Sequence, residues 1–290
     1  MNDMPRITQE MIDLYDHFTH VSTDKAAYLD KLTALVGSRE VAEFVTSQIA
    51  ANKMSAPLAA VDDPRLTIEK VTFGENMTGY LAMPKNASGK LPTVMVVHEN
   101  RGLVPHIEDV ARRVALEGFI ALAPDFLQPL GGTPEDEDVG RDMIGKLDRA
   151  QTVKNAVDAI AYLKALPAGN GKVGAVGYCW GGGIVNAAAV ASGDNLDACV
   201  AYYGAQPKAE DVPKIKANMM LHYAGLDERI NAGIDAFKAA LESNKKPYEI
   251  FVYDGAQHAF NNDTTAARYH KEASELAWSR TIGMFKKTLG

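Results

Sequence analysis

Residues 172–183 read KVGAVGYCWGGG, an apolar run followed by a cysteine with glycines on both sides. The segment Gly177-Tyr178-Cys179-Trp180-Gly181 fits the pattern Gly-x-nucleophile-x-Gly, which forms a sharp turn from a strand into a helix. Glycines flank the nucleophile because larger side chains would collide across so tight a turn. The turn places Cys179 at a helix N-terminus, where free N–H groups and the macrodipole favour a thiolate. We therefore interpret Cys179 as a nucleophile.

The overall composition excludes several classes of protein. The chain has 290 residues and a formal net charge of −7, which argues against a nucleic-acid partner. It contains no apolar stretch long enough to span a bilayer and no evident signal peptide, so no membrane association is expected. Its two cysteines, Cys179 and Cys199, cannot form a disulfide framework and suggest a reducing compartment. We expect a cytoplasmic protein.

The chain divides into two parts. In residues 8–50 apolar side chains recur every three or four positions, as in amphipathic helices. From residue 66 onward, short β-branched and apolar runs alternate with helical patterns. We predict that residues 1–62 form a helical N-terminal extension and that residues 63–290 form a second domain.

Alternating strands and helices in this second domain predict a mainly parallel, doubly wound α/β sheet with helices on both faces. Residues 129–142, rich in Gly, Pro and acidic residues, are predicted to be a loop, with the acidic cluster 135–138 in solvent. The expected strands are residues 66–73, 80–83, 93–97, 119–123, 173–176, 199–203, 219–223 and 248–253.

A nucleophile needs a base, and the base needs a group that orients it. Asp227 follows the strand 219–223, and His258 follows the strand 248–253. Both therefore lie at carboxyl ends of strands, where catalysis takes place in open α/β sheets. The chain order of nucleophile, acid and histidine also fits a triad. Two alternatives remain open: that Cys179 is a buried structural residue, and that Asp227 only caps the following helix.

Other candidate residues are interpreted as structural. Cys199 lies in the middle of an apolar strand and is expected in the core. His222 lies inside a strand and is expected to be a satisfied buried histidine. The histidines on helical segments are interpreted as surface or packing residues; these are His17, His20, His106 and His270.

An oxyanion hole would need two backbone N–H groups. One is expected from Trp180, directly after the nucleophile, and the other from near Asn100, in a loop that follows an early strand. Glu99, beside Asn100, is unusual there because a carboxylate would oppose developing negative charge. It makes more sense as a group that opposes ionisation of the cysteine and so controls it.

Together these residues resemble the dienelactone hydrolase family of carboxymethylenebutenolidase-like enzymes. The likeness covers residues 65–288 and is closest to the YghX-like branch, which shares the His-Glu-Asn-Arg-Gly-Leu stretch beginning at His98. The resemblance implies the α/β-hydrolase fold and a Cys179–His258–Asp227 triad. It also implies that Glu99 holds the resting thiol and releases it when substrate binds.

Two features depart from the family pattern. Asn262 occupies the position, four residues past the histidine, where better-known members carry an arginine for the substrate carboxylate. The candidates to replace that arginine are Arg101, Arg229 and Arg268. The N-terminal helices, absent from the simplest members, are expected to cover the active site, to pack between subunits of a homo-oligomer or only to shield the sheet.

We therefore expect a cysteine-dependent hydrolase of a small ester or lactone that acts through a thioester and needs no metal or organic cofactor. His258 would take the thiol proton, and water activated by the same residue would cleave the thioester. The main alternative is a weakly catalytic binding or thiol-sensing module with this fold. A further alternative is acyl transfer to an acceptor other than water.

Overall fold

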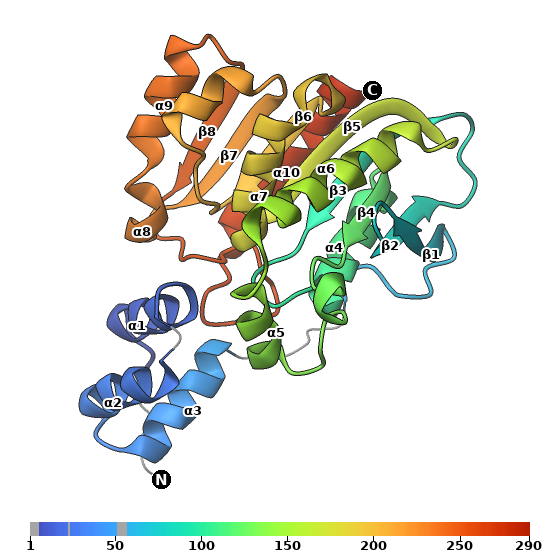
Figure 1. Ribbon diagram of the computed structural model, residues 1–290. Coiled ribbons are helices and arrows are strands. Elements are labelled where there is room, and N and C mark those ends of the chain that lie inside the picture. The colour runs from blue at the N-terminus through green and yellow to red at the C-terminus, as the bar shows by residue number, and fades with distance from the viewer. Residues whose placement is uncertain (1–5, 23, 51–56) are drawn as a thin grey trace.

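An eight-stranded sheet runs through the protein in the order β1-β2-β4-β3-β5-β6-β7-β8 (Figure 1). The computed structural model describes residues 6–22, 24–50 and 57–290. The first two pairs, β1 with β2 and β2 with β4, are antiparallel, and the remaining pairs are parallel. The strands are β1 (Leu66–Phe73), β2 (Met77–Pro84), β3 (Leu91–Val97), β4 (Ile120–Pro124), β5 (Gly169–Tyr178), β6 (Ala198–Tyr202), β7 (Asn218–Ala224) and β8 (Tyr248–Tyr253).

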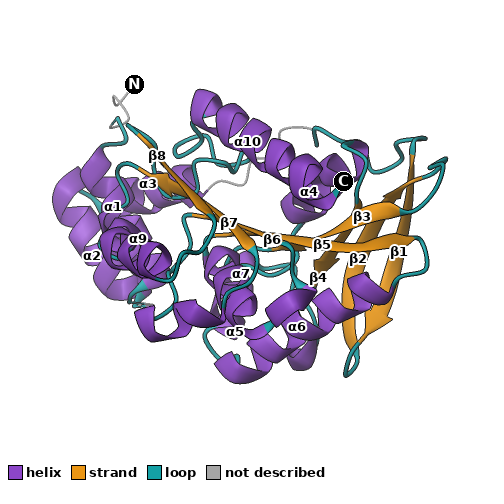
Figure 2. Ribbon diagram, turned by 90° about the horizontal axis from the view of Figure 1, so that it is seen from above, coloured by secondary structure: helices purple, strands orange, loops and turns teal. Residues whose placement is uncertain are grey.

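Helices cover both faces of this sheet (Figure 2). One face carries α4 (Pro105–Leu116) and α10 (Lys271–Leu289), and the other carries α6 (Arg149–Ala165), α7 (Trp180–Ala191) and α9 (Ile234–Ser243). The short α8 (Glu228–Asn231) follows β7. The predicted mainly parallel, doubly wound α/β-hydrolase fold is confirmed.

The two faces have separate cores because side chains alternate along each strand. In β3, Val94 and Val96 belong to the core under α4 and α10, whereas Met95 and Val97 belong to the opposite core. All four are fully buried. A strand covered on both sides is apolar throughout, which is why the run 93–97 was recognisable in the sequence.

The N-terminal helices form a small cluster of their own. They are α1 (Gln9–His20), α2 (Lys25–Val36) and α3 (Arg39–Ala50), and their buried core includes Leu32 and Ile49. In Figure 1 this cluster lies beside α5 and below the sheet. No helix in the described part of the chain is long and apolar enough to cross a membrane.

The prediction of a loop over residues 129–142 is wrong in its second half. Residues Glu137–Ile144 form the helix α5, and the side chain of Asp136 caps it by accepting from the N–H groups of Asp138 and Val139. Two acidic residues in the first turn favour the positive end of a helix. The acidic cluster is also paired, because Asp138 contacts Lys25 at 3.2 Å and Arg141 at 3.0 Å.

The turn around Cys179 leads to a prediction about stability. A Cβ atom at Gly181 would overlap the backbone oxygen of His98. Gly181→Ala should therefore lower the free energy of unfolding by about 3 kcal/mol or more, as overpacking does, measured by urea denaturation. The control is Gly283→Ala in α10, where a Cβ meets no atom within 4 Å and a small stabilisation is expected. Equal stability of both variants would contradict this account of the turn.

Candidate active site

The cysteine turn has the strained geometry of a nucleophile elbow. β5 ends at Tyr178, α7 begins at Trp180, and Cys179 between them has φ 55° and ψ −116°. A positive φ is costly for a residue with a side chain and persists only where its surroundings enforce it. Here the N–H of Cys179 donates to the carbonyl of Tyr202 at 3.0 Å, and Cys179 is 6% exposed.

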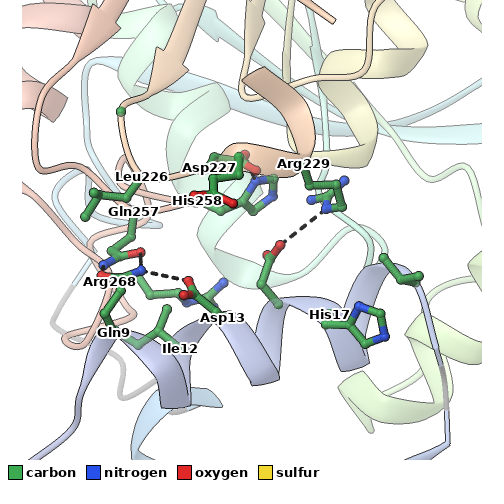
Figure 3. A pocket seen from close by; sticks show the side chains of 14 residues that line it. Gln9, Ile12, Asp13, His17, Leu226, Asp227, Arg229, Gln257, His258 and Arg268 are labelled. Atoms are coloured by element: carbon green, nitrogen blue, oxygen red, sulfur yellow. Dashed lines mark hydrogen bonds and ion pairs between the residues drawn. The ribbon is translucent and has the colours of Figure 1, made fainter. Parts of the chain in front are cut away.

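Asp227 and His258 meet as the sequence predicts. Nδ1 of His258 lies 2.5 Å from Oδ2 of Asp227, and both side chains are buried (Figure 3). Burial alone would raise the pKa of Asp227, but the charge and hydrogen bond of His258 outweigh it and hold the pKa below its usual value. Asp227 also caps α8, because its Oδ1 accepts from the N–H of Ile230 at 3.2 Å. The capping and orienting roles therefore coexist in one side chain.

The sulfur of Cys179 contacts a histidine that we did not predict at the site. Nε2 of His20, the last residue of α1, lies 3.1 Å from Sγ. Among the described residues, Nε2 of His258 has no hydrogen-bond partner. One ring nitrogen of each histidine and the sulfur all lie within 4.8 Å of one another. The interpretation of His20 as a surface or packing residue is wrong, because α1 is placed over the carboxyl ends of the strands.

The same three side chains are of the types that bind zinc in proteins. Their ligand atoms, all within 4.8 Å of one another, are close enough to form a three-ligand group. Behind each histidine stands a carboxylate, Asp16 for His20 and Asp227 for His258. Such carboxylates orient histidines in metal sites and in catalytic triads alike.

Glu99 lies near the cysteine but is bound by another residue. Its Oε2 accepts a hydrogen bond of 2.8 Å from the side chain of Asn262. Both residues line a cavity of about 30 Å³ together with Cys179. The residue that departs from the family pattern thus holds the carboxylate that we expect to control the nucleophile.

The proposed oxyanion donors border a larger cavity. Trp180 and Asn100 line a cavity of about 290 Å³ that also reaches Cys179. Trp180 is the first residue of α7, where backbone N–H groups have no partner within the helix. The loop that carries Asn100 is held by the buried His98, whose Nδ1 lies 2.7 Å from the carbonyl of Glu99. The ring of His98 also stacks on Trp180, with centroids 5.2 Å apart.

The three predicted substrate arginines border different cavities, although Arg229 and Arg268 share the cavity of about 380 Å³ shown in Figure 3. Arg229 borders the cavity of about 290 Å³, whereas Arg101 and Arg268 line the smaller one. Arg101 donates to the hydroxyl of Tyr15 at 2.8 Å, and the guanidinium of Arg268 lies 5.5 Å from the centre of the same ring. These two arginines therefore hold α1 in place.

Two arginines missed in the sequence also border the cavity of about 290 Å³. Arg141 is paired with Asp138 and Asp142. Arg149 donates to the carbonyl of Gly183 at 3.4 Å. Among the described residues it forms no ion pair with a carboxylate. Burial lowers the pKa of Arg149. No local pattern marked Arg149, because it faces the site only through the packing of α6 against α7.

A second large cavity, of about 380 Å³, lies between α1 and the loops that carry Asp227 and His258 (Figure 3). Ile12 and His17 border it from the helix, and Leu226 and Gln257 from the loops. Helix α1 therefore covers the loops at the carboxyl ends of β7 and β8 but leaves space between itself and these loops.

Cys199 and His222, both interpreted as structural, are buried away from this chemistry. Cys199 is fully buried, and burial raises the pKa of its thiol. His222 is also fully buried and contacts Thr281 at 3.1 Å and Tyr253 at 2.9 Å. Burial lowers the pKa of His222 to about 3, so the ring is neutral. Both predictions are confirmed.

Comparison with known proteins agrees with this geometry. The model of the "Dienelactone hydrolase family" matches residues 77–289. The chain belongs to the dienelactone hydrolase family. An Escherichia coli protein named "Putative carboxymethylenebutenolidase" is 33% identical over 229 residues, which cover 74% of this chain and 83% of that protein.

Two further relatives support the membership. The "Putative hydrolase fragment YghX" of Escherichia coli is 52% identical over 92 residues, or 30% of this chain and 78% of the fragment. The crystal structure of a protein described as a dienelactone hydrolase of Klebsiella pneumoniae superposes with a TM-score of 0.69 at 30% identity. It covers 76% of this chain and 98% of that one. The predicted family is confirmed, and the chain is a dienelactone hydrolase-like hydrolase.

The buried pair of Asp227 and His258 yields a prediction about activity. Asp227→Asn would replace the carboxylate that stabilises a charged imidazole and would favour the wrong tautomer of His258. We expect kcat for an activated ester to fall by about 10³-fold or more, measured by steady-state kinetics. Asp254→Asn, in the loop that carries His258 but exposed, is the control and should keep its activity. Comparable losses in both variants would contradict an orienting role for Asp227.

Proposed function

We propose that this protein is a cysteine-dependent hydrolase of small esters or lactones that acts through a thioester on Cys179. The observation that carries the proposal is the position of Cys179. It lies at the elbow between β5 and α7, within 4.8 Å of ring nitrogens of two histidines. Each of these histidines has a carboxylate behind it. A nucleophile, a base and an orienting acid in this arrangement are the parts of covalent acyl-transfer catalysis.

In the proposed reaction the thiolate of Cys179 attacks the substrate carbonyl. The oxyanion that forms would be stabilised by the N–H groups of Trp180 and Asn100, which border the cavity at the cysteine. Collapse of this intermediate expels the alcohol or enol and leaves a thioester. An enol, as from a conjugated lactone, departs easily and suits a thiol nucleophile. His258, oriented by Asp227, then activates the water that cleaves the thioester.

The charge around the cavity favours an anionic substrate. Arg149 and Arg229 both border it, and Arg149 lacks a carboxylate partner in the described part of the chain. A cation without a counter-ion is available to pair with a negatively charged group of the substrate. We infer that the substrate carries a carboxylate and that Arg149 takes the role of the arginine missing at Asn262. The expectation that Arg101 or Arg268 binds the substrate stays a prediction.

The nucleophile is tested by Cys179→Ala. The variant should lose at least about 10³-fold in kcat on 4-nitrophenyl acetate and on a small lactone, because the covalent route is gone. The matched control is Cys199→Ala, which removes the other thiol of the chain and should retain activity. Retention of most activity in Cys179→Ala would refute the proposed mechanism.

The alternative function, a thiol-sensing module, is distinguished from a hydrolase by mass spectrometry of the intact protein. The wild type is incubated with iodoacetamide in one sample and with a panel of esters in another. Rapid alkylation at Cys179 without turnover of any ester would favour the sensor. Turnover together with a transient acyl adduct on Cys179 supports the hydrolase. Product analysis with added alcohols or amines would detect acyl transfer to an acceptor other than water.

The anionic substrate is tested by Arg149→Gln with two esters of the same acyl size, one neutral and one with a distal carboxylate. Loss of a charge-assisted contact should lower kcat/KM for the anionic ester about tenfold or more. The value for the neutral ester, which serves as the internal control, should change little. Equal effects on both esters would show that Arg149 does not recognise the substrate's charge.

A further inference from the structure

The N-terminal helix α1 contributes a histidine to the reacting sulfur. Nε2 of His20 is 3.1 Å from Sγ of Cys179. The ring of His20 meets that of His258 edge to face, with centroids 4.7 Å apart and an angle of 65° between the planes. Two imidazoles thus border one cysteine, although a single base is enough for the triad implied by the family.

His20 is oriented in the manner of a catalytic histidine. Its Nδ1 lies 3.0 Å from Oδ1 of Asp16 and 2.9 Å from the backbone oxygen of the same residue. The hydroxyl of Thr19 also lies 2.9 Å from Nδ1. In the tautomer that carries its proton on Nδ1, facing Asp16, Nε2 of the neutral ring is free to accept a proton from the thiol. Asp16 is held in turn by Arg229, whose Nε lies 3.3 Å from Oδ2. Asp16 thus lies within ion-pair distance of His20, as Asp227 does of His258.

The electrostatic surroundings favour a proton on His20. Burial alone would lower the pKa of His20, but the charge of Cys179 and the hydrogen bond to Asp16 outweigh it and raise the pKa. Burial would likewise raise the pKa of Asp16, but His258, His20 and Arg229 hold it well below its usual value. An ionised carboxylate therefore stands behind an imidazole that readily becomes positive.

Helix α1 is fixed to the hydrolase domain by contacts on several sides. The side chain of Asn100 donates to the carbonyl of Thr19 at 3.2 Å. At the other end of the helix, Gln9 donates to the side chain of Gln257 at 2.9 Å (Figure 3). Arg101 binds the hydroxyl of Tyr15 in the middle. These contacts position His20 from both ends of its helix.

We propose that His20 is a catalytic residue that takes the proton of Cys179 during acylation, while His258 activates water during deacylation. This division of roles rests on the proposed hydrolase function. It accounts for two observations. The sulfur contacts Nε2 of His20, and Nε2 of His258 has no hydrogen-bond partner among the described residues.

The two half-reactions balance. In the first, the thiol proton passes to Nε2 of His20, the sulfur bonds to the carbonyl carbon, and the C–O bond to the leaving group breaks. The leaving oxygen takes the proton from His20. In the second, His258 takes a proton from water, whose oxygen bonds to the acyl carbon. The C–S bond then breaks, and the sulfur takes the proton from His258.

The charged and titratable groups around the sulfur come from several helices and from the loops after the strands. Those that line the two cavities at the sulfur, together with the carboxylates behind its two histidines, are Tyr15, Asp16, His20, Glu99, Arg101, His106, Glu137, Arg141, Arg149, Tyr203, Asp227, Arg229, His258 and Arg268. Substitution of His20 by Gln leaves all the others in place. The pH dependence of the thiol's reactivity therefore reports on His20 in that variant.

The test compares full-length wild type with His20→Gln, His258→Gln and the control His17→Gln. His17 lies on the same helix and is exposed. Stopped-flow release of 4-nitrophenolate from 4-nitrophenyl acetate separates the acylation burst from steady turnover, and intact mass counts the acyl adduct. His20→Gln should slow the burst about 10²-fold, as loss of a general base does. His258→Gln should keep the burst of one equivalent and accumulate the acyl-enzyme.

A second measurement does not depend on ester hydrolysis. The rate of Cys179 alkylation by iodoacetamide is followed against pH in the same proteins. Loss of a positive neighbour should shift the midpoint of the rate to higher pH in His20→Gln, by about one unit. His17→Gln should match the wild type. Asp16→Asn keeps the ring of His20 but removes its carboxylate, and it should shift the midpoint in the same direction without truncating the histidine.

Two results would overturn the proposal. A normal burst in His20→Gln with no burst in His258→Gln would assign both proton transfers to His258 and leave the hydrolase function intact. An alkylation profile unchanged in both His20→Gln and Asp16→Asn would also exclude His20. Absence of turnover and of an acyl adduct in the wild type would instead reject the hydrolase function, and with it the assigned half-reaction.

Discussion

The chain geometry at Cys179 is the constraint on which the site depends. The backbone of Cys179 has φ 55°, which a residue with a side chain adopts only where the surrounding backbone enforces it. Gly177 allows β5 to approach the start of α7, and Gly181 allows α7 to approach the end of β3, more closely than any other residue would permit. The hydrogen bond to Tyr202 ties the turn to the neighbouring strand β6. The thiol is consequently presented at the edge where β3, β7 and β8 also end.

The loops after these strands bring together residues that are distant in sequence. Asp227 follows β7 and His258 follows β8, so a parallel sheet places them side by side. Glu99 follows β3 and is held by Asn262. The loop after β8 therefore serves two purposes, because it carries the histidine and also the amide that binds the carboxylate near the nucleophile. Asn262 donates a hydrogen bond to Glu99 without bringing a positive charge.

Much of this arrangement could be predicted from local sequence, because it follows from strand order. The apolar runs at 93–97 and 219–223 have few alternatives to buried strands, and residues at their carboxyl ends meet at one edge. Cys179, Asp227 and His258 could be found in this way. Helix α5 was missed because its apolar content is low, although Asp136 offered a capping signal. His20 could not be found, because a histidine on a helix does not indicate which loop it faces. Only the tertiary packing of α1 brings it to the sulfur.

The contacts that fix α1 decide which residues a shortened version of this protein must keep. The family model begins at residue 77, whereas Asp16 and His20 lie some sixty residues earlier and contact the nucleophile's immediate surroundings. A recombinant protein trimmed to the family region would keep every motif residue and most of the sheet. It would nevertheless open the site to solvent and leave the sulfur without its nearest neighbour. The region matched by the family model and the part of the chain that surrounds the sulfur therefore differ in length.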